Sequence, residues 1–181
     1  HARSLAKATP ARIALGVFTL LIGVFTALLS LPIAATDGQR TALSTALFTA
    51  TSAVCVNGLA VVDTESHWST FGEVVIMVLV QVGGLGIISL ASLLGLLVAR
   101  RIGLRLQILA QAENKSLELG ESKRVVLGVV RMSLAVEAVT ALFLFARFAL
   151  GYDVSLGRAA YLAVFHAVTA YNNAGIALYS D

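Results

Sequence analysis

Residues 46–64 read ALFTATSAVCVNGLAVVDT, an apolar stretch with no charge before Asp63 but several Thr, Ser and Asn residues. The charge-free run around it covers residues 41–62. A helix over Thr41–Ala53 would be about 20 Å long, which reaches only the middle of a bilayer. Irregular backbone at that depth persists only where it is buried in protein or lines a wet cavity. We therefore predict a re-entrant pore loop over residues 41–62, a short helix followed by an extended return.

The composition of the whole chain indicates an integral membrane protein. Of its 181 residues, 58% are hydrophobic and 13% are charged, and the mean hydropathy is +0.89. A disordered chain is less hydrophobic and more charged, and a soluble globule needs more polar surface. We assign the net charge of +3 to cytoplasmic loops rather than to nucleic-acid binding. The single cysteine, Cys55, excludes an intrachain disulfide and a CxxC site.

The longer apolar runs predict three membrane spans, over residues 13–36, 74–99 and 125–152. A second run interrupted by polar residues predicts another pore loop over residues 157–176. Basic residues gather at the N-terminus and in the segment 99–124. Both groups lie in the cytoplasm, as the positive-inside rule requires, only if residues 41–62 return to the side from which they entered.

The sequence thus predicts an all-α membrane protein, multi-pass in the cell membrane, with a cytoplasmic N-terminus. Residues 1–98 form a complete helix–pore loop–helix repeat, and residues 99–124 form a cytoplasmic basic loop with a short solvated helix. Residues 125–181 form a second repeat that lacks its last helix. Because the chain starts at His1 and stops at Asp181 within this unfinished repeat, we expect it to be a fragment.

The two predicted pore loops resemble each other. Residues 47–59 align with residues 164–176 at an offset of 117 residues. Internal repeats are common in transport proteins. The alignment pairs identical residues at Phe48/Phe165, Ala50/Ala167, Ala53/Ala170 and Gly58/Gly175.

The backbone after each predicted pore helix carries carbonyl groups without helical partners. A ring of such carbonyls can replace the water shell of a dehydrated cation, and the C-terminal end of a helix dipole favours a cation. Gly58 and Gly175 lie where the returning chain needs a positive φ, which glycine adopts readily. These residues indicate a cation-conducting membrane subunit.

Three motifs together resemble the Trk/Ktr/HKT cation transporters, and most closely the Ktr-type membrane subunit. Residues 46–64 resemble the first filter region, residues 81–87 (QVGGLGI) the start of the following helix, and residues 165–175 (FHAVTAYNNAG) the second filter region. The resemblance implies a potassium-uptake pore subunit with four such repeats around one pore. It implies a filter made here of Val56, Asn57, Gly58, Leu59, Asn173, Ala174 and Gly175. It also implies that the backbone carbonyls of Val56, Asn57, Asn173 and Ala174 hold the potassium ion.

The resemblance has further implications for partners and ions. It implies a homodimer of the full-length subunit in the lipid bilayer and a cytoplasmic nucleotide-binding regulatory ring near the basic face. Potassium is the ion, sodium is a candidate coupling ion, and no organic cofactor or nucleic acid is implied. Because the third and fourth repeats are missing, we expect that the 181-residue chain alone forms no selective pore.

The chain departs from the family pattern at Asn57, where Thr more often precedes the glycine. If only the backbone carbonyl acts on the ion, Asn57 matters little. If the Asn57 side chain packs behind the filter, it affects the preference for potassium over sodium.

Residues outside the filter also have predicted roles. Gly83, Gly84 and Gly86 are expected at close helix contacts with the pore helix. Cys55 is expected to be a small buried apolar residue, and Trp68 an anchor at the outer membrane interface. His166 is expected to pack or cap within the second pore helix.

Two acids are predicted to support the pore. Glu137 lies about 19 Å into its span, too deep to reach either surface, so it needs a partner. Either a structural hydrogen bond or a direct contact with the ion would provide that partner. Asp63 follows the first filter segment on the outer side, where it attracts cations or belongs to an ordinary solvated loop.

Two alternatives to conduction come from other functional classes. A structural membrane assembly subunit would not need a filter-like repeat. An intramembrane hydrolase would need a nucleophile and a base, for which only Ser52 and His166 qualify. No Gly-x-Ser-x-Gly turn surrounds Ser52, so we predict a cation transport subunit and no enzyme.

Overall fold

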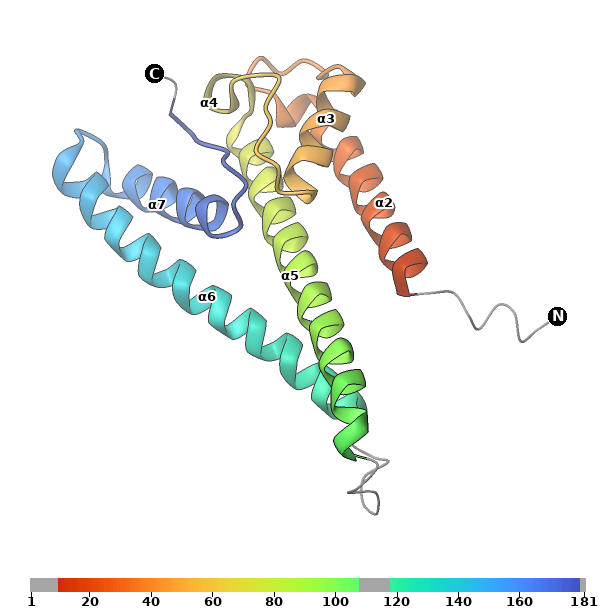
Figure 1. Ribbon diagram of the computed structural model, residues 1–181. Helices are drawn as coiled ribbons and strands as arrows, with labels where there is room; N and C mark the ends of the chain where they lie inside the picture. The colour runs from red at the N-terminus through yellow and green to blue at the C-terminus, as the bar shows by residue number, and fades with distance from the viewer. Residues whose placement is uncertain (1–9, 108–117, 180–181) are drawn as a thin grey trace.

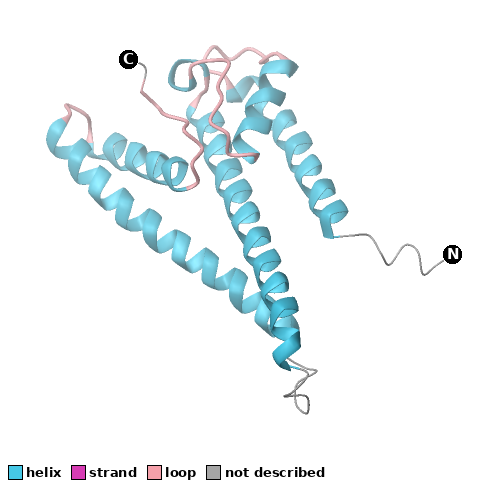
Figure 2. Ribbon diagram, in the orientation of Figure 1, coloured by secondary structure: helices cyan, strands magenta, loops and turns pink. Residues whose placement is uncertain are grey.

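The computed structural model describes residues 10–107 and 118–179, and within these ranges it contains helices and no strand (Figure 2). The predicted all-α class is confirmed. Part of the predicted basic loop 99–124 lies outside the described residues. The helices, in chain order, are α2 (Pro10–Leu29), the short 3-10 helix η1 (Pro32–Ala34), α3 (Leu43–Val54), α4 (Thr64–His67), α5 (Thr70–Gln107), α6 (Glu118–Gly151) and α7 (Leu156–Tyr171).

Helix α5 is the centre of the arrangement (Figure 1). It contacts α2, α3 and η1 on one side and α6 and α7 on the other. The short helix α3 packs on the long helix α2, and the short helix α7 packs on the long helix α6. Two pairs of a long and a short helix therefore flank one shared helix.

The helix lengths divide into two classes. Thr70–Ser89 in α5 and Arg124–Gly151 in α6 are long and apolar enough to cross a bilayer. Helix α2 has 20 residues, about 30 Å, which matches the hydrocarbon thickness. Helix α3 has 12 residues and α7 has 16, so they measure about 18 and 24 Å and are too short to cross.

Helix α2 ends at Leu29 rather than at residue 36, the end of the predicted span. The cause is Pro32, because a proline disfavours helical backbone at the residue before it. Leu31 accordingly has ψ 144°, and the chain turns into η1 instead of continuing as one helix.

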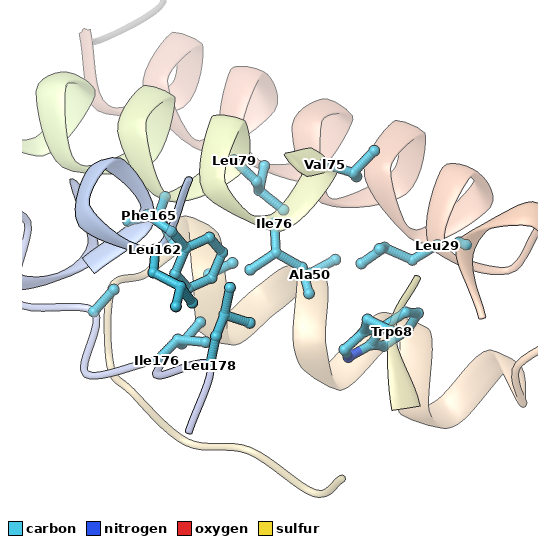
Figure 3. Close-up of a cluster of buried hydrophobic side chains, with 14 of the residues drawn as sticks. Leu29, Ala50, Trp68, Val75, Ile76, Leu79, Leu162, Phe165, Ile176 and Leu178 are labelled. Atoms are coloured by element: carbon cyan, nitrogen blue, oxygen red, sulfur yellow. The ribbon is translucent and has the colours of Figure 1, made fainter. Parts of the chain in front are cut away.

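The core lies between α5 and the two short helices (Figure 3). Helix α3 contributes fully buried alanines, such as Ala46 and Ala50, whose small side chains allow a close backbone approach. Ile76 and Leu79 of α5 are also fully buried. Figure 3 shows Ile176 and Leu178, which follow α7, beside Phe165 in the same cluster.

Trp68 belongs to this core and is only 2% exposed. An isolated antiparallel bridge pairs it with Ala35, and a Cβ on Gly72 would lie 3.1 Å from its ring. The prediction that Trp68 anchors the chain at the outer membrane interface is therefore wrong. The bridge to Ala35 places the indole between η1 and α5.

Two neighbouring glycines of α5 touch the ends of the two short helices. A Cβ on Gly83 would collide with the backbone carbonyl of Val54, the last residue of α3. A Cβ on Gly84 would collide with the side chain of Asn172, which follows α7. Gly86 instead faces α2, where the Phe18 ring would lie 3.6 Å from its Cβ. The predicted packing role is confirmed for Gly83 and Gly84, whereas Gly86 contacts a different helix.

We expect Gly83→Ala to lower the amount of folded protein. The methyl group meets backbone rather than a side chain that can rotate away, and overpacking of this kind costs about 1–3 kcal/mol. That loss exceeds the gain of about 1 kcal/mol that alanine brings to a helix interior. Thermal stability in detergent measures the change. Gly86→Ala, in the same helix, is the control and should keep wild-type stability; equal melting temperatures for both variants would contradict the packing model.

Candidate functional site

Helix α3 ends in a left-handed backbone turn. The Val56 N–H donates to the Ala53 carbonyl at 3.3 Å, and the Asn57 N–H donates to the Ser52 carbonyl at 3.2 Å. This pair of bonds is the Schellman motif, which needs a residue of positive φ just after the helix. Val56 is that residue, with φ 50°. The turn ends the helix and leads the chain into an extended segment.

Helix α7 ends in the same way at the positions that the repeat alignment predicts. The Asn173 N–H donates to the Ala170 carbonyl at 3.0 Å, and the Ala174 N–H donates to the Thr169 carbonyl at 2.8 Å. Asn173 has φ 58°, so it corresponds to Val56 at the offset of 117 residues. Two residues further on, Gly58 has φ 73° and Gly175 has φ 62°. The two segments therefore share their backbone conformation as well as their sequence.

The positive φ at Val56 is unusual. A β-branched residue is a genuine outlier in the left-handed region, whereas asparagine tolerates it. The surrounding structure must therefore hold Val56 in place, and strained backbone of this kind is concentrated at functional sites.

The two extended segments meet. A Cβ on Gly58 would lie 2.7 Å from the Ala174 carbonyl oxygen and 3.5 Å from the Gly175 Cα. A Cβ on Gly175 would lie 3.6 Å from the Gly58 Cα. Only a residue without a side chain fits at Gly58, because both the backbone angle and the neighbouring carbonyl exclude one.

A family profile described as "TrkH: Cation transport protein" matches residues 11–181. The chain belongs to the TrkH family. The resemblance predicted from the three motifs is confirmed, and this family is one of transport proteins rather than enzymes.

Named relatives support the same assignment. The Ktr system potassium uptake protein B of Bacillus subtilis is 39% identical over 177 residues, which cover 95% of this chain and 38% of that protein. Its namesake in Vibrio alginolyticus is 36% identical over 181 residues, which cover 99% of this chain and 38% of that protein. The potassium/sodium uptake protein NtpJ of Enterococcus hirae is 29% identical over 175 residues, 97% of this chain and 38% of that protein. The TrkH-family chain described here thus spans 38% of the length of these relatives.

Side chains behind the first segment support its backbone. The Ser52 Oγ lies 2.6 Å from both the Asn57 Oδ1 and the Leu59 carbonyl oxygen, and its one proton serves either acceptor. The Leu59 N–H donates to the Asn57 Oδ1 at 3.2 Å. Ser52 is buried. The Asn57 side chain, although the residue is exposed, therefore takes part in the hydrogen bonds that support this segment.

A polar chain across three helices supports the second segment. The Asn172 Nδ2 donates to the Gln81 Oε1 at 3.0 Å, and the Gln81 Nε2 donates to the Glu137 Oε1 at 3.0 Å. Glu137 and Asn172 are 6% and 5% exposed. The structure thus gives Glu137 a hydrogen-bonding partner. Sequence analysis overlooked Gln81 as that partner, although a polar residue in each of two adjacent spans is the signal that pairs them.

A second buried acid was also overlooked. Glu73, 3% exposed in α5, accepts a hydrogen bond from the Tyr161 hydroxyl of α7 at 2.7 Å. Because Glu73 lies at the edge of a predicted span, its sequence position gave no sign of burial. The bond ties α5 to α7 at the end where α7 begins.

Cys55 and Asn172 occupy equivalent positions at the ends of α3 and α7, but their surroundings differ. Cys55 is exposed, so the prediction of a buried apolar residue is wrong. The helix turns at Cys55 away from the packed alanine face, whereas Asn172 is held inside by Gln81.

Asp63 lies after the first segment and caps the short helix α4. Its Oδ2 accepts hydrogen bonds from the Ser66 hydroxyl at 2.6 Å and the Ser66 N–H at 3.0 Å. These two bonds hold the pKa of the Asp63 carboxyl below its usual value, the hydroxyl contributing most. The carboxylate therefore stays ionised at neutral pH and is exposed beside the segment.

We expect Glu137→Gln to keep most of the wild-type stability and Glu137→Ala to lose about 1–3 kcal/mol. Glutamine keeps an oxygen for the Gln81 amide, whereas alanine leaves that buried N–H group without an acceptor. Thermal unfolding in detergent separates the two variants. In a full-length protein carrying this chain, a Glu137→Gln variant as stable as the wild type but slower in cation transport would exclude a purely structural role for the carboxylate.

Proposed function

We propose that this chain supplies two of the filter segments of a potassium-uptake pore. In this proposal the backbone carbonyls of Val56, Asn57, Asn173 and Ala174 coordinate a dehydrated monovalent cation. The paired glycines and Leu59 shape the passage. The named relatives are potassium or potassium/sodium uptake proteins, which supports this choice of ion.

The observation that carries the proposal is the repeated backbone geometry. Both helices end in the same left-handed turn, both returning segments place a glycine of positive φ two residues later, and the two glycines face each other. A structural assembly subunit has no need of two such turns at membrane depth. A cation site does, because such turns free carbonyl groups from helical hydrogen bonds.

Helix dipoles add to the attraction for a cation. The C-terminal ends of α3 and α7 lie where the segments begin, and neither helix has a basic residue in its last turn. Each end carries about half a negative charge, which is poorly screened where water is excluded. Asp63 adds a full negative charge beside the first segment, on the outer side in the proposed topology.

The remaining parts of the proposal concern the complete protein. We place residues 1–9 and 99–124 in the cytoplasm and the segments after α3 and α7 on the outer side. The full-length subunit would form a homodimer and bind a cytoplasmic nucleotide-binding ring near the basic loop. Sodium is a candidate coupling ion.

We expect Gly58→Ser, in a full-length protein carrying this chain, to lower the preference for potassium over sodium. Serine would incur both a positive-φ cost of about 1–2 kcal/mol and a collision with the Ala174 carbonyl. Gly175→Ser meets only the first cost, since its nearest neighbour is 3.6 Å away, so its effect should be smaller. Competitive potassium and sodium uptake, normalised to folded protein, measures both.

Gly38 provides a matched control for backbone strain. It also has a positive φ, 67°, but no atom lies within 4 Å of its Cβ position. Gly38→Ser should therefore change stability slightly and leave the ion preference unchanged. An unaltered potassium-to-sodium ratio in both filter variants, beside normal expression, would refute the filter assignment.

We expect Gln39→Cys to react with a membrane-impermeant thiol reagent added outside intact cells, and Glu118→Cys not to react. The basic residues of segment 99–124 favour the cytoplasm, whereas residue 39 lies in the loop before the first pore helix. Both substitutions belong in a Cys55→Ser background, because Cys55 is exposed and would react itself. External labelling at position 118 would contradict the proposed topology.

A further inference from the structure

His166 of α7 holds the backbone of the second returning segment. Its Nδ1 lies 2.8 Å from the Leu162 carbonyl oxygen, one turn earlier in the same helix. Its Nε2 lies 3.2 Å from the Leu178 backbone nitrogen, three residues after Gly175. The imidazole therefore joins the pore helix to the chain that leaves the filter.

The two contacts fix the protonation state of the ring. A backbone N–H can only donate, so the Nε2 that accepts from Leu178 carries no proton. A carbonyl can only accept, so the Nδ1 facing Leu162 carries the proton. A neutral imidazole has one donor nitrogen and one acceptor nitrogen. Both hydrogen bonds therefore exist together only in the neutral form.

The Leu178 contact holds in place the extended segment that follows Gly175. Leu178 is fully buried and Ile176 is 7% exposed, while Ala177 and Tyr179 point outward. Within the described residues, His166 is the side chain that forms a hydrogen bond with the backbone of this segment between Gly175 and Tyr179. Losing that bond would leave a buried N–H group without an acceptor and release the strand beside the filter glycine.

The first segment is held differently. Ser52 and Asn57 bond its backbone at Leu59, and neither side chain gains or loses a proton in the physiological pH range. The second segment is held through an imidazole nitrogen, which no longer accepts a hydrogen bond once a proton is added to it.

We infer that His166 is a positioning residue that fixes the second filter segment through Leu178 and makes ion selectivity sensitive to acid. The inference rests on the proposed filter function. A proton added at Nε2 converts the acceptor into a donor, so the Leu178 bond breaks and a positive charge appears next to the cation path.

The rings in contact with the imidazole are Phe148, Phe165 and Tyr179. Among the described residues, the nearby ionisable groups bond or pack elsewhere. Arg158 lies 3.6 Å from Glu65 and packs over Tyr161, Glu73 accepts from Tyr161, and Arg147 packs over Tyr152.

The test compares glutamine and asparagine at position 166 in a full-length protein carrying this chain. Glutamine places an amide oxygen near the Nε2 position, where it can accept from Leu178, and it does not titrate. Asparagine is shorter and reaches only the Leu162 carbonyl. Competitive potassium and sodium uptake is measured in proteoliposomes at about pH 8 and about pH 5.5, one mildly basic and one mildly acidic value.

In the wild type, the potassium-to-sodium ratio should fall by up to about tenfold at the lower pH, the factor for one lost buried hydrogen bond. His166→Gln should keep a high ratio at both values. His166→Asn should have a low ratio at both. The amount of folded protein is measured for each, and if His166→Asn does not fold, the pH profile of His166→Gln decides alone.

An equal fall of the potassium-to-sodium ratio in the wild type and in His166→Gln would overturn the inference. If His166 had only a structural role, replacing it with glutamine would leave the pH profile unchanged. Gly58→Ser is measured in parallel. If it lowers the ratio while His166→Asn keeps the wild-type ratio at about pH 8, the inference fails and the proposed function stands. If no variant changes the ratio, the filter assignment fails and the inference fails with it.

Discussion

The contact on which this structure depends is the close approach of the ends of the two short helices to the glycine pair of α5. Gly83 lies against the last carbonyl of α3, and Gly84 lies against the residue that caps α7. A side chain at either position would push a short helix away from the central one. Both short helices end beside this pair, α3 at Val54 and α7 at Tyr171. The glycine pair therefore sets where both returning segments begin.

The ends of the short helices also need hydrogen-bond partners. The left-handed turns at Val56 and Asn173 provide hydrogen-bond donors for some of the carbonyl groups at the C-terminus of each helix. Under the proposed function, carbonyls of the returning segments coordinate the cation. The cost is the strained φ of Val56, and the support from Ser52 and Asn57 on the same segment offsets it.

Much of this arrangement could be predicted from the residues. The sequences of the two predicted pore loops align at an offset of 117 residues. The positive φ at Gly58 and Gly175 follows from the need of the chain to turn after each short helix. The positive φ at Val56 could not be foreseen, because a valine gives no local sign of it. The burial of Trp68 and the exposure of Cys55 also depend on contacts between distant residues, which composition and periodicity do not report.

The two segments share a backbone but not the side chains that hold it, and this difference has a physical origin. Helix α3 packs an alanine face on α5, so a small hydroxyl at Ser52 suffices to reach the returning strand. Helix α7 packs on α6 and is held from behind by Asn172, Gln81 and Glu137. Its returning strand lies among aromatic rings, where only a longer polar side chain such as His166 reaches the backbone. A repeat that keeps its backbone fixed can thus be held by different side chains in each of its two copies.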